Sequence, residues 1–127
     1  MMARQLIDIG ARYASSGEIE AGRQTAFIRY GRHLWELGET ELITFDDGGA
    51  ARRFRVRALL VIRAELRDLP LRVCIQSGSA DHADLRVKLE RQEMLSSARR
   101  PDDPGKSPVR VLLSSRVTAL TFQLMCD

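Results

Sequence analysis

The residues best suited to chemistry in this sequence are four arginines that lie close together, Arg52, Arg53, Arg55 and Arg57. A guanidinium group presents a rigid fork of N–H donors that matches the oxygens of a phosphate. A row of such groups on a β-sheet can follow the backbone of a nucleic acid or hold a nucleotide. We therefore take these arginines as the candidate anion-binding residues.

The segment directly before the arginines supports a competing interpretation. Residues 36–47 contain five acids and no basic residue, a net charge of −5, whereas residues 52–72 contain seven arginines against two acids, a net charge of +5. If the two segments form neighbouring strands, cross-strand ion pairs neutralise much of the row. Nucleic-acid binding surfaces usually leave their positive charge unopposed and offer aromatic side chains, which make up only 6% of this chain. The pattern thus favours a ladder of ion pairs over a binding face.

Arg53 and Arg57 have the spacing Arg-x-x-x-Arg, which resembles the first half of the motif by which PilZ domains bind a cyclic dinucleotide. The second half of that motif needs an Asp or Asn, then a Ser, then a Gly at fixed spacing. The segment Ile75–Ser79 reads Ile-Gln-Ser-Gly-Ser and does not supply it. The likeness is limited to the arginine run, and the chain is not assigned to this family.

Few other residues are suited to catalysis or to metal binding. Asp81-His82-Ala83-Asp84 places a histidine between two carboxylates, but His33 is the only other histidine, so we interpret the segment as a polar turn. Gly105-Lys106-Ser107 resembles the end of a phosphate-binding loop, but Arg100 stands where the first glycine is required. The sequence predicts no metal, no cofactor and no enzymatic activity.

Length and composition predict one domain with a conventional core, because the chain has 127 residues and 44% of them are hydrophobic. The longest apolar run, residues 58–62, is far shorter than the roughly 20 residues needed to cross a bilayer, and no secretory signal is recognisable. We expect a cytoplasmic or virion-associated protein with no membrane partner and with Cys74 and Cys126 reduced. Only two of its 20 basic residues are lysine and asparagine is absent, which indicates a GC-rich bacterial or phage genome.

The arginines begin a long alternating segment, which predicts that a β-sheet forms the centre of the molecule. From Phe54 to Leu66 every even position is apolar and most odd positions are charged, as in a strand with one buried face. Residues 41–45 and the turn-forming residues 46–49 precede it and predict a hairpin. The register that best matches apolar and charged partners pairs Leu42 with Phe54, Thr40 with Val56, Glu41 with Arg55, and Glu39 with Arg57.

A strand of this length must bend in a small domain, so we expect a bulge within residues 58–62. A helix over residues 58–67 is the alternative, because these residues are good helix formers.

The remaining segments predict a single α+β domain over residues 1–127. Ser15 and Glu18 form a capping-box pattern that opens an amphipathic helix ending at Gly38. Alternation predicts further strands over residues 71–76, 85–90, 109–113 and 117–126, and three prolines predict an exposed loop over 96–108. The expected fold is an N-terminal amphipathic helix (residues 1–38) packed on an antiparallel β-meander of about six strands (residues 39–127).

Large apolar side chains give four candidate interface residues, Tyr30, Trp35, Phe122 and Leu124. The helix face and a strand at the sheet edge would join subunits or bind a partner protein, although burial in the core explains the same residues. The sequence favours a non-enzymatic binding or assembly protein, such as a structural component of a bacterial or phage assembly, with a homo-oligomer or another protein as its partner. The alternative is a nucleic-acid or nucleotide binder that uses residues 52–57.

Overall fold

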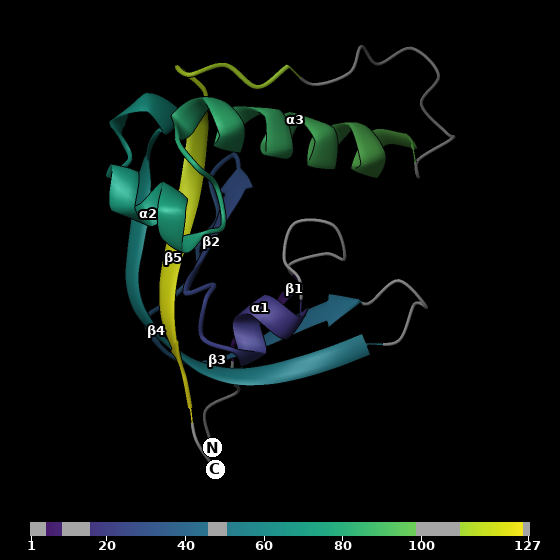
Figure 1. The fold of residues 1–127 in the computed structure, drawn as a ribbon, viewed down its shortest axis with the longest axis vertical. Helices are drawn as coiled ribbons and strands as arrows, with labels where there is room; N and C mark the ends of the chain where they lie inside the picture. The colour runs from purple at the N-terminus through teal and green to yellow at the C-terminus, as the bar shows by residue number, and fades with distance from the viewer. Residues whose placement is uncertain (1–4, 9–15, 46–50, 99–109, 126–127) are drawn as a thin grey trace.

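The computed structural model describes residues 5–8, 16–45, 51–98 and 110–125. Its centre is a mixed five-stranded sheet in the order β1-β3-β4-β5-β2, which curls into half a barrel (Figure 1). β1 pairs in parallel with β3, and the other neighbouring strands are antiparallel. The strand bounds are β1 Gln5–Asp8, β2 Ala26–Tyr30, β3 Gly38–Phe45, β4 Ala51–Glu65 and β5 Arg116–Leu124.

The predicted hairpin between β3 and β4 is confirmed, and so is its register. On one face Leu42 pairs with Phe54 and Thr40 with Val56, and on the other Glu41 pairs with Arg55 and Glu39 with Arg57. The expected bulge is present as well, because Ala58 pairs with Phe122 and Leu60 pairs with Thr121, which makes Leu59 the extra residue. The bulge lets β4 bend, and the strand continues to Glu65, so the helical alternative for residues 58–67 is wrong.

The predicted N-terminal amphipathic helix is wrong. Among the described residues of this segment, only α1, Ser16–Glu20, is helical, and the residues that follow form β2. Gly22 and Gly31 have φ angles of +75° and +89°, a left-handed conformation that glycine adopts at little cost. The first glycine turns the chain after α1 and the second turns it after β2, so the two residues that weaken a long helix act here as turn residues.

The antiparallel meander of about six strands is also wrong, because two predicted strands are helices. Residues 71–76 form α2, Leu71–Gln76, and residues 85–90 lie within α3, His82–Ala98. Leu85 and Leu89 are buried one helical turn apart while Val87 is 44% exposed, so the apparent alternation is one face of a helix. A short 3-10 helix, η1 Leu66–Asp68, follows β4, and residues 110–115 contain no strand.

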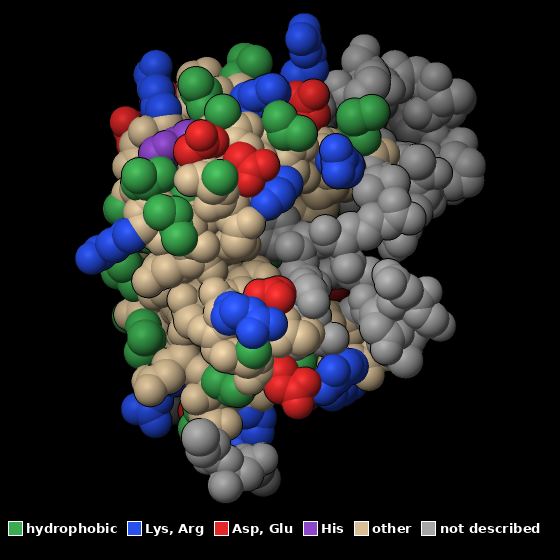
Figure 2. Space-filling view, in the orientation of Figure 1, with side chains coloured by type: hydrophobic (Ala, Val, Ile, Leu, Met, Phe, Trp, Pro, Cys, Tyr) green, Lys and Arg blue, Asp and Glu red, His purple; other side chains and the backbone are tan. Residues whose placement is uncertain are grey.

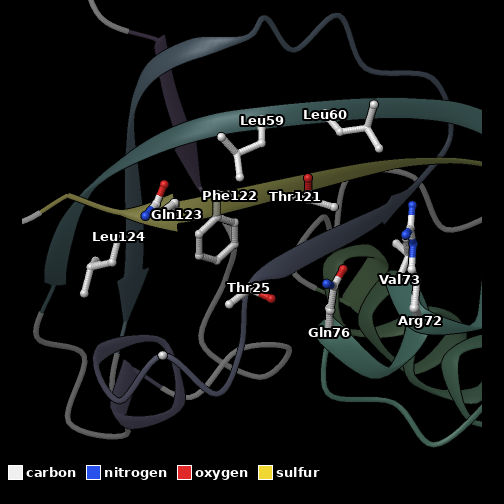
Figure 3. A pocket seen from close by; sticks show the side chains of 11 residues that line it. Thr25, Leu59, Leu60, Arg72, Val73, Gln76, Thr121, Phe122, Gln123 and Leu124 are labelled. Atoms are coloured by element: carbon white, nitrogen blue, oxygen red, sulfur yellow. The ribbon is translucent and has the colours of Figure 1, made fainter.

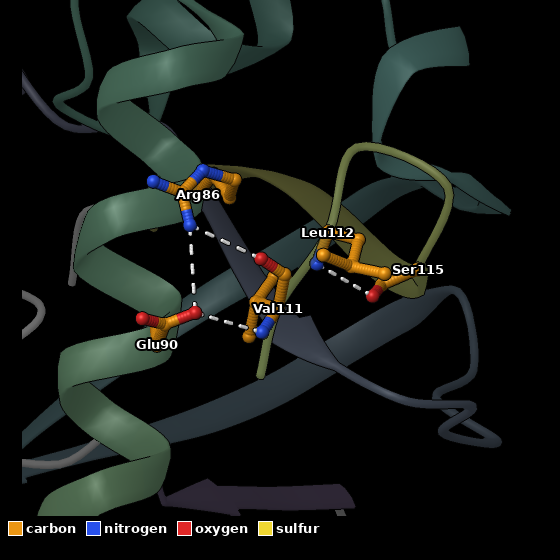
Figure 4. Close-up of polar contacts among 5 residues, drawn as sticks. All are labelled: Arg86, Glu90, Val111, Leu112 and Ser115. Carbon is orange, nitrogen blue, oxygen red and sulfur yellow. Dashed lines mark hydrogen bonds and ion pairs between the residues drawn. The ribbon is translucent and has the colours of Figure 1, made fainter. Parts of the chain in front are cut away.

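The segment before β5 is held against α3 instead of joining the sheet (Figure 4). The Glu90 carboxylate accepts a hydrogen bond from the Val111 N–H at 3.0 Å and lies 3.4 Å from Arg86, which in turn donates to the Val111 carbonyl at 3.2 Å. The Leu112 N–H donates to the Ser115 hydroxyl at 2.8 Å. Side chains thus satisfy backbone groups that a strand would have paired with a neighbour.

Two buried clusters lie on opposite faces of the sheet. β2 and β5 contribute alternate residues to each, so the sheet is covered on both sides here. The cluster inside the curl consists of Ile7, Ile19, Phe27, Leu42, Phe54, Val56, Ala58, Leu120 and Phe122. The cluster beneath α2 and α3 consists of Ala26, Ile28, Leu66, Leu69, Val73, Cys74, Leu85, Leu89, Val111, Val117 and Ala119.

Two further predictions fall mainly outside the described residues, namely the turn at 46–49 and the loop at 96–108, of which 96–98 end α3. Among the helices that the structure describes, none has the length and apolar character needed to cross a membrane.

Candidate functional site

The arginine row predicted from the sequence is divided between the two faces of β4. Arg53, Arg55 and Arg57 occupy alternate positions and share one face, whereas Arg52 lies on the other face with Phe54. The Arg52 guanidinium lies 5.5 Å from the centre of the Phe54 ring and 2.9 Å from the Glu20 carboxylate of α1. Arg52 therefore ties α1 to the sheet and does not extend the row.

The three remaining arginines face the carboxylates of β3. Arg53 lies 3.2 Å from Glu41, Arg55 lies 4.0 Å from Glu39, and Glu39 is also the cross-strand partner of Arg57. These pairs form the ladder that the sequence favoured. A phosphate approaching this face would have to compete with carboxylates already in place, so the row is a poor candidate for a backbone-binding surface.

A second group of arginines comes together at the far end of β4. The ladders place Arg63 of β4, Thr118 of β5 and Arg29 of β2 side by side in one row across the sheet. Arg116 precedes Thr118 by two positions on β5, so it lies on the same face, which is the face opposite α2 and α3. This juxtaposition links residues that are far apart in the sequence.

Arg63 and Arg116, together with Arg32 from the turn after β2, line one cleft of about 250 Å³. The lining residues are Gly31, Arg32, Arg63, Ala64, Arg116 and Val117. No carboxylate is among them, in contrast to the ladder on β3 and β4. The acid nearest by register is Glu65, opposite Arg116, and its carboxylate lies 2.8 Å from Arg67.

The turn after β2 places Arg32 beside the sheet. Gly31 has a φ angle of +89°, and its N–H donates to the Arg116 carbonyl at 2.8 Å. The Thr118 hydroxyl donates to the Gly31 carbonyl at 2.8 Å and accepts from the His33 N–H at 2.9 Å. One glycine and one buried threonine thus fix the path of residues 31–33 over the end of the sheet.

Arg63 holds the same segment through its backbone. Its guanidinium donates to the carbonyls of His33 at 2.8 Å and Trp35 at 3.3 Å. Carbonyl acceptors do not neutralise a guanidinium, so the positive charge of Arg63 remains beside the cleft. The rings of His33 and Trp35 stack with their centres 5.1 Å apart and their planes at 17°, and both side chains are half-buried.

The four candidate interface residues are placed in or against the core. Phe122 is 3% exposed, whereas Trp35, Leu124 and Tyr30 pack on the two buried clusters. β5, which carries Phe122 and Leu124, lies between β4 and β2 and is not an edge strand, so it cannot add a strand from another subunit.

The Asp81–Asp84 segment caps α3. The Asp81 carboxylate accepts from the Asp84 N–H at 2.8 Å, and the Asp84 carboxylate accepts from the Ala80 N–H at 2.8 Å. The Ala80 bond, with help from Lys88, lowers the pKa of Asp84. Among the described residues no cluster of metal-binding side chains is present, and burial raises the pKa of the Cys74 thiol.

Sequence reasoning missed the cleft arginines, Arg32, Arg63 and Arg116, as a group. Only Arg63 belonged to a recognised pattern, the charged face of the alternating strand. The others become neighbours through the strand order and through the turn at Gly31, neither of which the sequence shows.

Comparison with known proteins establishes the fold. No protein-family model and no curated protein matches the sequence. The crystal structure of protein EF3133 from Enterococcus faecalis V583, described under the family model DUF984, matches with a TM-score of 0.59 and 13% identity, over 98% of this chain and 82% of that one. An ASCH domain from Lactobacillus crispatus JV V101 matches with a TM-score of 0.56 and 10% identity, over 94% and 79% of the two chains. The chain therefore shares the fold of these DUF984 and ASCH domain structures.

Proposed function

We propose that this chain binds nucleic acid and that Arg32, Arg63 and Arg116 contact backbone phosphates. The supporting observation is that three arginines from three separate segments line one cleft, and that no carboxylate is among the described residues that line it. Arginine forks bind phosphate oxygens bidentately, and an unopposed basic surface is the usual footprint of a nucleic-acid binder. The net charge of +3 and the pI near 9.3 support the same kind of partner.

A single strand fits this site better than a duplex. The cleft is small, at about 250 Å³, and the stacked His33 and Trp35 rings lie on the segment that Arg63 holds. Proteins that bind single strands combine a basic groove with aromatic side chains on which bases stack. We keep the prediction that the chain binds without catalysing a reaction, and a cytoplasmic location suits such a role.

Fluorescence anisotropy with a labelled single-stranded RNA of mixed sequence tests this proposal. The double substitution Arg32→Ser and Arg116→Ser should weaken binding at least about tenfold, because each lost charge-assisted contact is worth roughly 1.5–3 kcal/mol. Arg63 is left in place because it holds residues 33 and 35. Circular dichroism melting should show that the variant remains folded.

The matched control is the double substitution Arg53→Ser and Arg57→Ser, which removes the same charge from the ladder. It should change the affinity by no more than about twofold, because these arginines face the carboxylates of Glu41 and Glu39. If both double substitutions weakened RNA binding equally, binding would be assigned to the row at residues 52–57 or to net charge alone. Absence of binding to any strand at low salt would refute the proposal.

A further inference from the structure

The bulge in β4 creates a second cleft, which has no part in the arginine site. Leu59 and Leu60 both turn outward there and remain 51% and 41% exposed. Together with α2 and β5 they border an open cleft of about 500 Å³ (Figure 3). A volume of this size is typical of sites that accept a ligand, and bulges are frequent beside such sites.

The surface around this cleft is apolar. Leu71 and Ile75 lie one turn apart on α2 and are 50% and 55% exposed, next to the α2 residues that line the cleft. Figure 2 shows hydrophobic side chains gathered along the left-hand side of the molecule, where α2 and β4 lie in Figure 1. Exposed apolar side chains that gather on one side of a small protein often mark a contact surface.

The polar groups of the cleft indicate what kind of chain it would take. Gln76 and Gln123 each offer an amide donor and an amide acceptor, the two groups that a peptide backbone needs. Among the described residues that line the cleft, Arg72 is the only charged one, and Arg57 lies beside Gln123 in the β4–β5 ladder. Because none of these described lining residues is a carboxylate, the cleft favours an acidic partner.

We propose that this cleft is a docking site for a peptide segment of a partner protein, in which an apolar anchor side chain lies close to an aspartate or glutamate. The apolar side chain would pack against the exposed side chains of Leu59 and Leu60, and the carboxylate would pair with Arg72. A second copy of this chain is a poorer fit, because symmetric contact would bring Arg72 of both copies to the same apolar face.

Selection of a random peptide library displayed on phage, with the full chain as target, tests the proposal. The selected peptides should share an apolar residue close to Asp or Glu. A fluorescein-labelled consensus peptide should bind the chain, and Arg72→Glu should weaken it at least about tenfold. The same peptide with lysine in place of its acid should regain affinity for the Arg72→Glu variant. Arg91→Glu, an exposed arginine of α3 outside the cleft, is the matched control and should change little.

Four results would overturn this inference. The selected peptides could lack the apolar–acidic pattern or bind the Arg72→Glu variant unchanged. Light scattering could show a dimer that Arg72→Glu disrupts or strengthens, which would make a second copy the occupant. A single-stranded RNA could compete with the peptide and lose affinity on Arg72→Glu, which would make nucleic acid the occupant. The test does not use Arg32 or Arg116. The peptide proposal can therefore fail without affecting the nucleic-acid proposal, and the nucleic-acid proposal can fail without affecting this one.

Discussion

Arg53 and Arg116 are both exposed arginines on β-strands, but their surroundings differ. The guanidinium of Arg53 lies 3.2 Å from the Glu41 carboxylate, whereas no acid is among the described residues that line the cleft of Arg116. An exposed ion pair adds little stability, yet it cancels much of the local field that would attract a phosphate. At the residue scale, the carboxylates nearby determine which arginines are available to a ligand.

The pair between Arg53 and Glu41 should contribute little to stability even though it opposes ligand binding. A double-mutant cycle with Arg53→Ala and Glu41→Ala should give a coupling energy of about 0.2–1 kcal/mol in urea unfolding, because the Arg53 side chain is 64% exposed. Adding salt should reduce the coupling. A coupling above about 2 kcal/mol would mean that the ladder is a main stabiliser of the hairpin.

Asp84 should make stability depend on pH. Its pKa is lowered mainly by the hydrogen bond from the Ala80 N–H, so its carboxylate stabilises the folded state above the unfolded pKa of about 3.9. That contribution is lost as the pH falls through the lower folded-state pKa. Asp84→Asn should therefore lower Tm at neutral pH, and the difference from the parent should shrink below about pH 3.

Asp68→Asn, on the exposed η1 turn, is the control for this measurement. Thermal melts followed by circular dichroism across the pH range would show the trend. A difference in Tm between the Asp84→Asn variant and the parent that stays constant with pH would contradict the assigned role of the carboxylate.

At the scale of elements, the segment from Gly31 to Leu37 connects β2 to β3 and begins at the arginine cleft. Gly31 has a φ angle of +89° and open space around the position of a Cβ, so substitution meets no clash. Gly31→Ala should still destabilise the fold by about 1–2 kcal/mol, because the left-handed conformation is costly for alanine. Urea unfolding measures this change.

Gly17→Ala in α1 is the matched control for that substitution. Gly17 is exposed within a helix and does not have a positive φ, so alanine there should be neutral or stabilising by up to about 1 kcal/mol. Equal destabilisation by both substitutions would show that the conformation of Gly31 is not the cause.

The sequence predicted those elements whose pattern has only one structural explanation. The alternation in β4 is long enough to define a strand, and its charges and apolar residues select one register with β3. Leu85, Val87 and Leu89 alternate over too few residues to separate a strand from one helix face, and α3 was missed for that reason. The glycines at 22 and 31 were assigned to a helix interior, although their φ angles show that they are turn residues.

At the scale of the whole molecule, strand order creates the candidate site. β5 lies between β4 and β2, which brings Arg116 beside Arg63 and close to the turn that carries Arg32. No local pattern predicts this order, because it depends on which faces are buried by α2 and α3. The arginines at 52–57 were found from the sequence because they are consecutive on one strand, and the same hairpin supplies the acids that oppose them.

The salt dependence of single-stranded RNA binding tests the central proposal most directly. The logarithm of the affinity should fall linearly with the logarithm of salt concentration, with a slope of about −0.7 for each phosphate contact. Replacing Arg32 and Arg116 with serine should reduce the size of that slope by about 1.4, whereas replacing Arg53 and Arg57 should leave it unchanged. The account would be contradicted if the ladder substitutions reduced the slope and the cleft substitutions did not. That result would place the RNA on residues 52–57.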